Sequence, residues 1–331
     1  MNIDIGYRVK FIKKRNSFRI ILGIIVIALV SSYISTTDWL KPKLQGKTLV
    51  IAHRAGSGLW PQNSRTAVLN SVATSKARHS DSRYQGIEID VVLTGDNQVV
   101  LSHDPWIHKL LCQKTSGETL NEQILIKNLT LHELQSGFLC GGLPDPDFPD
   151  VIPKAETIPT LNEVLGALKT APAMVLFLDV KIDGVLTASP EAYAEALAEC
   201  LDKADLPNKI YIEGPDSESL AAFRARIHSP FVASLSYPPF STDENPVMTV
   251  VKSRWLTKSR LKSPLEMART AKAEAIVSHT AVITWNAAKQ ANDAGIEVIL
   301  FTPNTKKDLE RYCHWPANIL ITDFPNLGHC P

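Results

Sequence analysis

The residues best suited to chemistry gather in one stretch of the sequence, positions 86–104, which reads GIEIDVVLTGDNQVVLSHD. The stretch predicts a strand, a turn at 95–98 and a second strand that returns alongside the first. Glu88 and Asp90 are two positions apart, so a strand directs both carboxylates to the same side. The returning strand ends at His103. Two carboxylates suit a hard divalent cation, and a neighbouring histidine suits proton transfer.

The alternative is a plain hairpin whose carboxylates point into solvent. The alternate positions of the first strand are Ile87, Ile89 and Val91, all of them apolar. Neither face of this strand therefore has the pattern of a simple exposed surface. We accordingly expect the two acids to have a functional role.

The composition is that of a globular protein with one large domain or two ordinary ones. The chain has 331 residues, of which 44% are hydrophobic and 21% charged. Its formal net charge of +1 is uneven, because residues 1–19 carry six Lys or Arg and one Asp, a net +5, which leaves −4 for residues 20–331. The mildly acidic body lacks the basic stripe that nucleic-acid binding needs.

The start of the chain has the layout of a membrane anchor or a signal peptide. A basic tail at 1–19 precedes an apolar segment at 20–37, and serines near the end of that segment permit cleavage. Its continuous apolar run is short of the roughly 20 residues that span a bilayer comfortably. We favour an anchor over a cleaved signal. The body, residues 46–331, is then expected on the extracytoplasmic side of a membrane, or secreted if the segment is cleaved.

The five cysteines fit an oxidising compartment. Cys112 and Cys140 bracket a loop-rich segment, and Cys313 and Cys330 bracket the last predicted strand, so either pair can form a disulfide. We expect Cys200, which lies in a helical pattern, to be the buried free thiol.

After residue 46, predicted strands and helices alternate along the chain. This alternation favours parallel strands, and eight of them in about 280 residues fit a (β/α)8 barrel. The competing fold, a doubly wound open sheet, predicts a glycine-rich phosphate fingerprint after the first strand, and RAGSG at 54–58 matches it poorly. The predicted strands lie at about 48–52, 86–92, 174–180, 209–213, 231–235, 275–278, 296–301 and 318–322.

The pattern loosens after the returning strand, over residues 105–159, where prolines stand at 144, 146, 149, 153 and 159. One helix-like piece, LTLHELQSG, interrupts it. We interpret 105–159 as an insertion, and long insertions are often functional. Trp60, Trp106 and Phe148 either line a lipid- or alcohol-binding mouth or pack as ordinary loop aromatics.

A barrel enzyme carries its active residues at the C-terminal ends of its strands, and the reactive side chains of this sequence follow that rule. They are His53 and Arg54 on the first predicted strand, Glu88 and Asp90 on the second, Asp179 and Lys181 on the third, Glu213 on the fourth, His279 on the sixth and Asp323 on the eighth. This clustering indicates an enzyme.

These motifs, in this order, resemble those of the glycerophosphodiester phosphodiesterase family. They are HR at 53–54, P-x-N at 61–63, ExD at 88–90 running on to HD at 103–104, DxK at 179–181 and ITDFP at 321–325. The resemblance spans residues 48–325. It implies a (β/α)8 (TIM) barrel with a small insertion after the second strand, which fits 105–159.

The resemblance also implies one divalent cation, calcium or magnesium, held by Glu88, Asp90 and Asp179. Asp179 stands where the family commonly has glutamate. Two further departures from the common pattern are Ala55, where HRG is usual, and Gln62, where PENT is usual. None of these removes a catalytic group.

His53 and His103 are implied as general acid and base, and we favour His103 as the acid. Arg54 and Lys181 are implied to face the phosphate. The nucleophile is either water or a neighbouring hydroxyl of the substrate. Arg54 can equally be a salt-bridge partner of the acids, and Lys181 can form a structural ion pair with Asp179.

The remaining polar residues have more ordinary expectations. Glu213 is expected to be an exposed loop carboxylate rather than a neighbour of the metal. Asp104 is expected either to hold its loop or to orient His103, and Asp323 to close the barrel without a chemical role. Asn63 either bonds the phosphate or caps the next helix.

Taken together, the sequence predicts a membrane-tethered, metal-dependent phosphodiesterase that cleaves a glycerophosphodiester into glycerol 3-phosphate and an alcohol. The alternative enzyme is a phospholipase D acting on lysophospholipids or sphingolipids in the same barrel. A binding or scaffolding protein on a decayed barrel is the non-enzyme alternative, and the retained His, Glu, Asp and Lys set argues against it. The expected partners are a small-molecule glycerophosphodiester or lysolipid and a membrane, and not nucleic acid.

Overall fold

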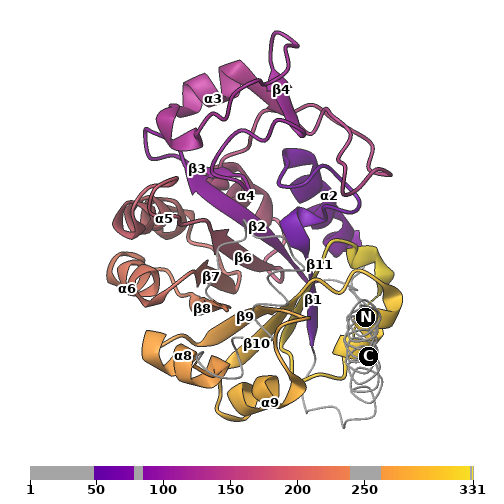
Figure 1. The fold of residues 1–331 in the computed structure, drawn as a ribbon, viewed down its shortest axis with the longest axis vertical. Helices are drawn as coiled ribbons and strands as arrows, with labels where there is room; N and C mark the ends of the chain where they lie inside the picture. Colours follow the sequence, from indigo (N-terminus) through magenta and orange to yellow (C-terminus); the bar gives the residue numbers. More distant parts are fainter. Residues whose placement is uncertain (1–47, 78–84, 239–261, 329, 331) are drawn as a thin grey trace, which may run out of the picture. The chain divides into compact units, whose positions relative to one another are not determined.

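The computed structural model describes residues 48–77, 85–238, 262–328 and 330. Eight parallel strands form a barrel with helices around it (Figure 1). Neighbours in the sheet follow chain order, and the first strand closes the ring by pairing with both the last and the second. This arrangement confirms the predicted barrel and excludes the doubly wound open sheet.

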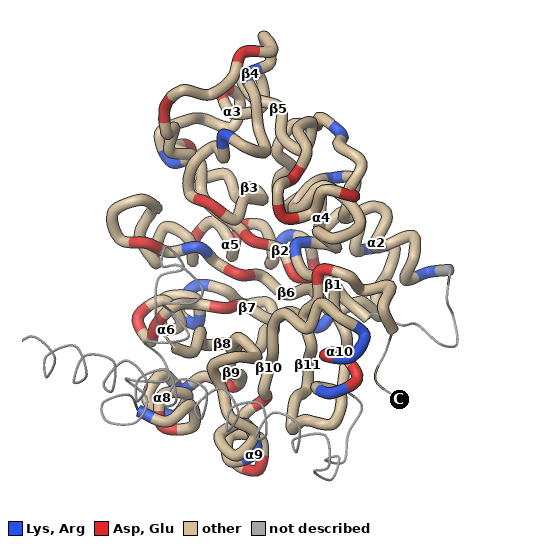
Figure 2. Tube along the Cα trace, turned by 45° about the vertical axis from the view of Figure 1, so that its right-hand side comes forward, with Lys and Arg blue, Asp and Glu red and all other residues tan. Residues whose placement is uncertain are grey.

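The observed barrel strands begin and end within two residues of the predicted ranges. They are β1 (Leu49–Ala52), β2 (Gly86–Leu93), β6 (Val175–Val180), β7 (Ile210–Gly214), β8 (Val232–Tyr237), β9 (Ala275–His279), β10 (Glu297–Phe301) and β11 (Ile319–Thr322). The helices around them are α2 (Arg65–Ala77), α4 (Leu161–Leu168), α5 (Pro190–Ala204), α6 (Ser217–Arg226), α8 (Pro264–Ala271), α9 (Trp285–Asp293) and α10 (Lys306–Tyr312). Figure 2 shows both signs of charge along the outer helices α6, α8 and α10.

The helices begin where local capping chemistry allows. Thr160 and Glu163 form a reciprocal capping box at the start of α4. Ser189 caps α5, whose first residue is a proline that needs no hydrogen-bond acceptor for its nitrogen. At α2, Ser64 Oγ accepts from the Ala67 N–H at 3.0 Å. Ser64, and not the neighbouring Asn63, is therefore the residue that caps α2.

Alternation along the strands separates two apolar layers. On each strand, every second side chain points outward, and those such as Ile87 and Ile89 on β2 belong to the core between barrel and helices. The side chains between them point inward, and those such as Ile51, Phe177 and Tyr211 pack together inside the barrel. Because side chains two positions apart point the same way, a polar residue two positions beyond an inward-facing one also faces the inside.

The predicted insertion is a small subdomain with its own apolar core, after the second barrel strand. It follows the returning strand β3 (Val99–Leu101), which pairs antiparallel with β2. Its elements are β4 (Cys112–Lys114), the 3-10 helix η3 (Ile126–Asn128), α3 (Leu131–Gly137) and β5 (Phe138–Cys140). The expected helix LTLHELQSG is α3, and Ile107, Ile126 and Leu134 are among the buried residues of this core.

Both expected disulfides are present. Cys112–Cys140 joins the paired strands β4 and β5, and Cys313–Cys330 ties the end of the chain to the residue after α10. Cys200 is free and buried in α5, as predicted. The predicted anchor at 20–37 lies outside the described residues, and within the described part no helix is long and apolar enough to cross a membrane.

Candidate active site

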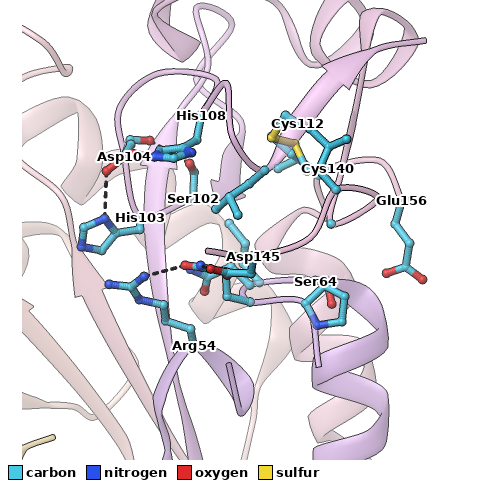
Figure 3. Close-up of a pocket in the computed structure, with 18 of the residues that line it drawn as sticks. Arg54, Ser64, Ser102, His103, Asp104, His108, Cys112, Cys140, Asp145 and Glu156 are labelled. Atoms are coloured by element: carbon cyan, nitrogen blue, oxygen red, sulfur yellow. Dashed lines mark hydrogen bonds and ion pairs between the residues drawn. A yellow bond between two sulfur atoms is a disulfide. The ribbon is translucent and has the colours of Figure 1, made fainter. Parts of the chain in front are cut away.

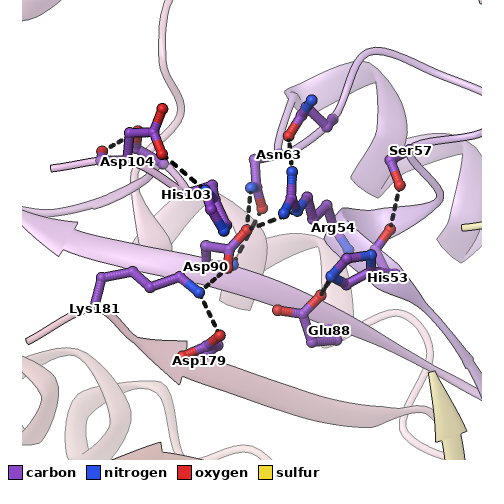
Figure 4. Close-up of polar contacts among 12 residues, drawn as sticks. His53, Arg54, Ser57, Asn63, Glu88, Asp90, His103, Asp104, Asp179 and Lys181 are labelled. Carbon is purple, nitrogen blue, oxygen red and sulfur yellow. Dashed lines mark hydrogen bonds and ion pairs between the residues drawn. The ribbon is translucent and has the colours of Figure 1, made fainter. Parts of the chain in front are cut away.

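Seven predicted site residues come together at the C-terminal end of the barrel (Figure 4). They arrive from four segments of the chain, and strand alternation explains their direction. Asp179 lies two residues beyond the inward-facing Phe177 on β6. The seven residues are His53, Arg54, Glu88, Asp90, His103, Asp179 and Lys181.

Three of the carboxylates can bind one cation. One oxygen from each of Glu88, Asp90 and Asp179 lies within 4.8 Å of the others. Asp90 and Asp179 are register partners on the parallel strands β2 and β6, which brings them side by side. Glu88 is only 2% exposed and Asp90 only 1%. An all-oxygen set of this kind, with two buried carboxylates and the half-buried Asp179, fits calcium or magnesium.

The electrostatics of these acids show why a cation suits them. Burial, together with the charges of Asp90 and Asp179, raises the pKa of Glu88 well above its usual range. Burial alone would also raise the pKa of Asp90, but the neighbouring cationic groups, Lys181 first among them, together outweigh burial and hold that pKa far below its usual range. The raised pKa means that the ionised form of Glu88 is disfavoured in this cluster. A cation between the three carboxylates would stabilise that ionised form.

Lys181 bridges two of the three acids. Its Nζ lies 2.8 Å from Asp90 Oδ1 and 2.5 Å from Asp179 Oδ2. Burial would lower the pKa of Lys181, but the Asp179 and Asp90 charges raise it. The expected ion pair with Asp179 is therefore present, and it lies at the edge of the predicted metal site.

Arg54 is held at its backbone and at its side chain. It lies in the short helix η2 (His53–Ala55) with a left-handed φ of 48°, an uncommon conformation that often marks functional sites. Its backbone N–H donates to Glu88 Oε2 at 2.7 Å, and its Nε lies 3.4 Å from Asp90 Oδ2. The expected salt bridge from Arg54 to an acid of β2 is therefore confirmed.

Each of the two histidines has a carboxylate on its Nδ1. His53 Nδ1 lies 2.5 Å from Asp323 Oδ1, and its Nε2 lies 3.8 Å from Glu88 Oε2. His103 Nδ1 lies 2.9 Å from Asp104 Oδ1, so the expected orienting role of Asp104 is confirmed as a contact. Burial and the nearby Lys181 charge lower the pKa of His103. In each pair the carboxylate leaves Nε2 as the nitrogen available to a substrate.

Asp323 was expected only to close the barrel, and this expectation was incomplete. Besides His53, its carboxylate accepts hydrogen bonds from Ser57 Oγ and Asn304 Nδ2. Burial would raise its pKa, but these bonds and the His53 contact lower it to about 2. In sequence, Asp323 and His53 lie 270 positions apart, and only closure of the barrel through β1 and β11 makes them neighbours.

The prediction that Glu213 is an exposed loop carboxylate was wrong. The residue is 7% exposed, in β7, and pairs in register with Asp179. Burial and the Asp179 charge raise its pKa to about 8, and its Oε1 accepts from Ser236 Oγ at 2.6 Å. The signal that could have identified it is alternation, because Glu213 stands two positions after the inward-facing Tyr211.

Asn63 supports an acid of the metal site and does not cap α2. Its Nδ2 donates to Asp90 Oδ2 at 2.7 Å, and its Oδ1 accepts from the Asp90 N–H at 3.2 Å. The first bond orients the Asp90 carboxylate, and the second holds the Asn63 amide against the β2 backbone at the same residue.

A cavity of about 290 Å³ opens beside Arg54, Asn63 and His103, between the barrel and the insertion (Figure 3). The Cys112–Cys140 disulfide forms part of its wall, and Trp106 lines it, as one of the sequence alternatives proposed. Phe148 instead packs edge-on against Phe324, with ring centroids 5.9 Å apart. The cavity is therefore a space next to the site that the insertion partly encloses.

The barrel, its acidic cluster and its two carboxylate-bound histidines define a (β/α)8-barrel hydrolase. More specifically, the chain belongs to the glycerophosphoryl diester phosphodiesterase family, whose model matches residues 53–327. It is thus an enzyme of that family, and the scaffold alternative has no support.

Individual proteins resemble the chain in sequence to a moderate degree. A glycerophosphodiester phosphodiesterase of Caldanaerobacter subterraneus is 25% identical over 84% of this chain and 95% of its own length. Another from Bacillus altitudinis is 28% identical, over 40% of this chain and 45% of its own length.

Solved structures share the fold. A crystal structure of a glycerophosphoryl diester phosphodiesterase from Silicibacter pomeroyi covers 88% of this chain and 95% of its own, with a TM-score of 0.70 at 19% identity. An Oleispira antarctica phosphodiesterase, solved with the product sn-glycerol-3-phosphate, has a TM-score of 0.60 at 20% identity, covering 84% of this chain and 94% of its own.

Proposed function

We propose that this chain hydrolyses glycerophosphodiesters to glycerol 3-phosphate and an alcohol at the cluster around Glu88 and Asp90. The observation that carries the proposal is the pair of histidines, each fixed through Nδ1 by a carboxylate, which approach one acidic cluster from different segments (Figure 4). The product held by the Oleispira antarctica relative supports the same chemistry.

Glu88, Asp90 and Asp179 would hold one calcium or magnesium ion. When bound, the ion would stabilise negative charge that builds on the phosphate oxygens. Asn63 orients Asp90 toward this position, and Lys181 keeps Asp90 ionised. The chain's own contribution is thus to keep Glu88 and Asp90 buried, and to keep Asp90 ionised and correctly turned.

Arg54 and Lys181 would bind the phosphate itself. Both cations lie against Asp90, so a phosphate oxygen near that residue meets positive charge already in place. Such preorganised charge lowers the reaction barrier most where water is excluded. Glu88 and Asp90, the two acids of β2, are both buried, so water has little access to this position.

His53 is proposed as the base and His103 as the acid. Asp323 keeps the His53 proton on Nδ1, so Nε2 can accept the proton of the attacking water or hydroxyl. His103 Nε2 then gives a proton to the leaving alkoxide. The lowered pKa of His103 disfavours its charged form, whereas the negative charge of a bound phosphodiester acts in the opposite direction.

The alcohol is proposed to occupy the cavity beside His103. A volume of about 290 Å³ accommodates a small polar group, at the lower end of the range of ligand pockets. A glycerophosphodiester and the corresponding lysophospholipid carry the same alcohol, so a direct comparison of the two substrates is needed to distinguish them.

The decisive experiment assays glycerophosphocholine and a lysophospholipid with and without a chelator. We expect chelator-sensitive release of glycerol 3-phosphate from the first, and a rate loss on the order of 10²–10⁴-fold in His103→Ala. Activity on the lysolipid alone would favour the phospholipase D alternative, and indifference to chelator would overturn the metal assignment.

We also propose that the enzyme domain acts outside the cytoplasm. The two disulfides support this, because structural disulfides persist in oxidising compartments. The basic tail at 1–19 and the apolar segment at 20–37 would tether it to the membrane. Both the location and the tether are tested by fractionating cells that express the protein with or without residues 1–37 and measuring in which fraction it is found.

A further inference from the structure

A chain of hydrogen bonds connects the insertion with the side chain of Arg54. Arg54 Nη1 donates to Gln62 Oε1 at 2.5 Å, and Gln62 Nε2 donates to Asp145 Oδ2 at 2.7 Å. The second oxygen of Asp145 accepts from the Asp147 backbone N–H at 2.9 Å. Figure 3 shows Arg54 and Asp145 on the wall of the same cavity.

Gln62 is the residue of this hydrogen-bond series whose side chain could adopt two orientations. Its amide has a donor end and an acceptor end of nearly the same shape, and only one orientation presents oxygen to Arg54. An ionised carboxylate only accepts, so Asp145 requires the NH₂ end of Gln62 and leaves the oxygen for the guanidinium. Asp145 is 8% exposed, which keeps this contact largely away from competing water.

Arg54 needs such support because its side chain is long and flexible. Its Nε faces Asp90 at 3.4 Å, beyond ordinary hydrogen-bond length, so Gln62 supplies its short side-chain contact. With Gln62 in the other orientation, an NH₂ group would face the guanidinium, and two donors would repel each other.

We propose that Asp145 is a positioning residue that fixes Gln62 and thereby holds Arg54 in its phosphate-binding orientation. Binding of the phosphate then depends on the insertion, although Asp145 does not touch the phosphate. The inference rests on the proposed function, in which Arg54 contacts the substrate phosphate.

The test asks whether a second substitution, Gln62→Glu, restores the phosphate binding that Asp145→Ala weakens. Asp145→Ala frees Gln62 to turn, so we expect KM for glycerophosphocholine and Kd for sn-glycerol 3-phosphate, the latter by calorimetry with Mg²⁺, to rise about tenfold. Gln62→Glu alone places a second carboxylate where the amide lay 2.7 Å from Asp145, and we expect it to weaken binding as well. In the double variant, the carboxylate introduced at position 62 pairs directly with Arg54, and both constants should return to within about threefold of the wild type.

Each result decides between specific explanations. If Asp145 touches the alcohol directly, or only supports the fold, the double variant stays as weak as Asp145→Ala and the inference is overturned. Unchanged constants in Asp145→Ala overturn it too, while the proposed function stands if His103→Ala still loses activity. A wild type that neither hydrolyses glycerophosphocholine nor binds glycerol 3-phosphate overturns both.

The matched control is Asp150→Ala, which removes an exposed carboxylate from the same insertion outside the cavity. We expect it to leave KM, Kd and the melting temperature unchanged. If Asp145→Ala does not fold, Asp145→Asn keeps the volume. Its single oxygen is needed by the Asp147 N–H, so its NH₂ group faces Gln62 and forces the Gln62 amide to turn. Weakened binding by a folded Asp145→Asn, reversed by Gln62→Glu, supports the inference, and wild-type binding contradicts it.

Discussion

Asp323→Asn is the sharpest single test of how the barrel positions its chemistry. The aspartate accepts from His53 Nδ1, Ser57 Oγ and Asn304 Nδ2 at once. An asparagine of the same shape has only one acceptor oxygen, so at least one of these donors meets an NH₂ group. Asn304 cannot easily turn to compensate, because its Oδ1 accepts from the Asp323 N–H at 3.0 Å.

The magnitude follows from the carboxylate's own pKa. Its fall from the ordinary 3.8 to about 2 corresponds to about 2.4 kcal/mol, since one pKa unit is about 1.4 kcal/mol. Asp323 is only 5% exposed, so solvent screening reduces this little. If most of that interaction serves to hold His53, its loss lowers kcat about 30- to 60-fold.

The assay is the initial rate of glycerol 3-phosphate release at saturating substrate, with KM determined in parallel. We expect kcat to fall with KM within about threefold, because His53 is proposed to act in the chemical step. His53→Ala combined with Asp323→Asn should be no slower than His53→Ala alone. The control is Asp202→Asn, which also loses a hydrogen-bonded carboxylate but lies far from the site, on α5. A kcat for Asp323→Asn within twofold of the wild type would refute the reasoning.

Three further predictions concern the Cys313–Cys330 disulfide, the metal site and the titration of Asp323. Replacing Cys313 and Cys330 by serine should lower the free energy of unfolding by about 3 kcal/mol, measured by urea denaturation, because their bond closes a 17-residue separation. Magnesium or calcium at about 100 times its Kd should stabilise the wild type by about 2.7 kcal/mol, seen as a higher melting temperature, and Asp90→Asn should abolish that shift. Because the folded pKa of Asp323 is depressed, its stabilisation is present above pH 3.8 and lost as pH falls toward 2. The stability difference between the wild type and Asp323→Asn should therefore shrink by about 1 kcal/mol between pH 5 and pH 3, and a constant difference would contradict this.

The strands and the central hairpin were predictable because they depend on local pattern. Fully buried parallel strands appear as continuous apolar runs, and the observed bounds differ little from the expected ones. The same holds for His103, because a short turn must return it beside Asp90. Here proximity in sequence determines proximity in space.

The contacts that were missed all join distant segments or irregular ones. Asp323 meets His53 only after the ring closes, and no periodicity in either segment encodes that contact. Asp145 meets Gln62 through an insertion without regular alternation, so its side-chain direction was not readable. Glu213 was readable in principle, since alternation along β7 directs it inward, but it was taken for the start of a loop.

The hairpin that carries His103 also divides the molecule into parts that can and cannot change in length. The β2–β3 ladder extends to a bond from the Ser102 N–H to the Asp90 carbonyl at 3.1 Å, so the histidine is fixed before the insertion begins. Residues 105–159 can therefore gain or lose segments over evolution while His103, the proposed proton donor, stays in place. One residue added to the turn between Leu93 and Val99 would slip the ladder and direct His103 to the opposite face. Descendants of this gene could thus exchange much of the insertion and keep the position of His103, as long as Asp145 or a replacement for it still holds Gln62.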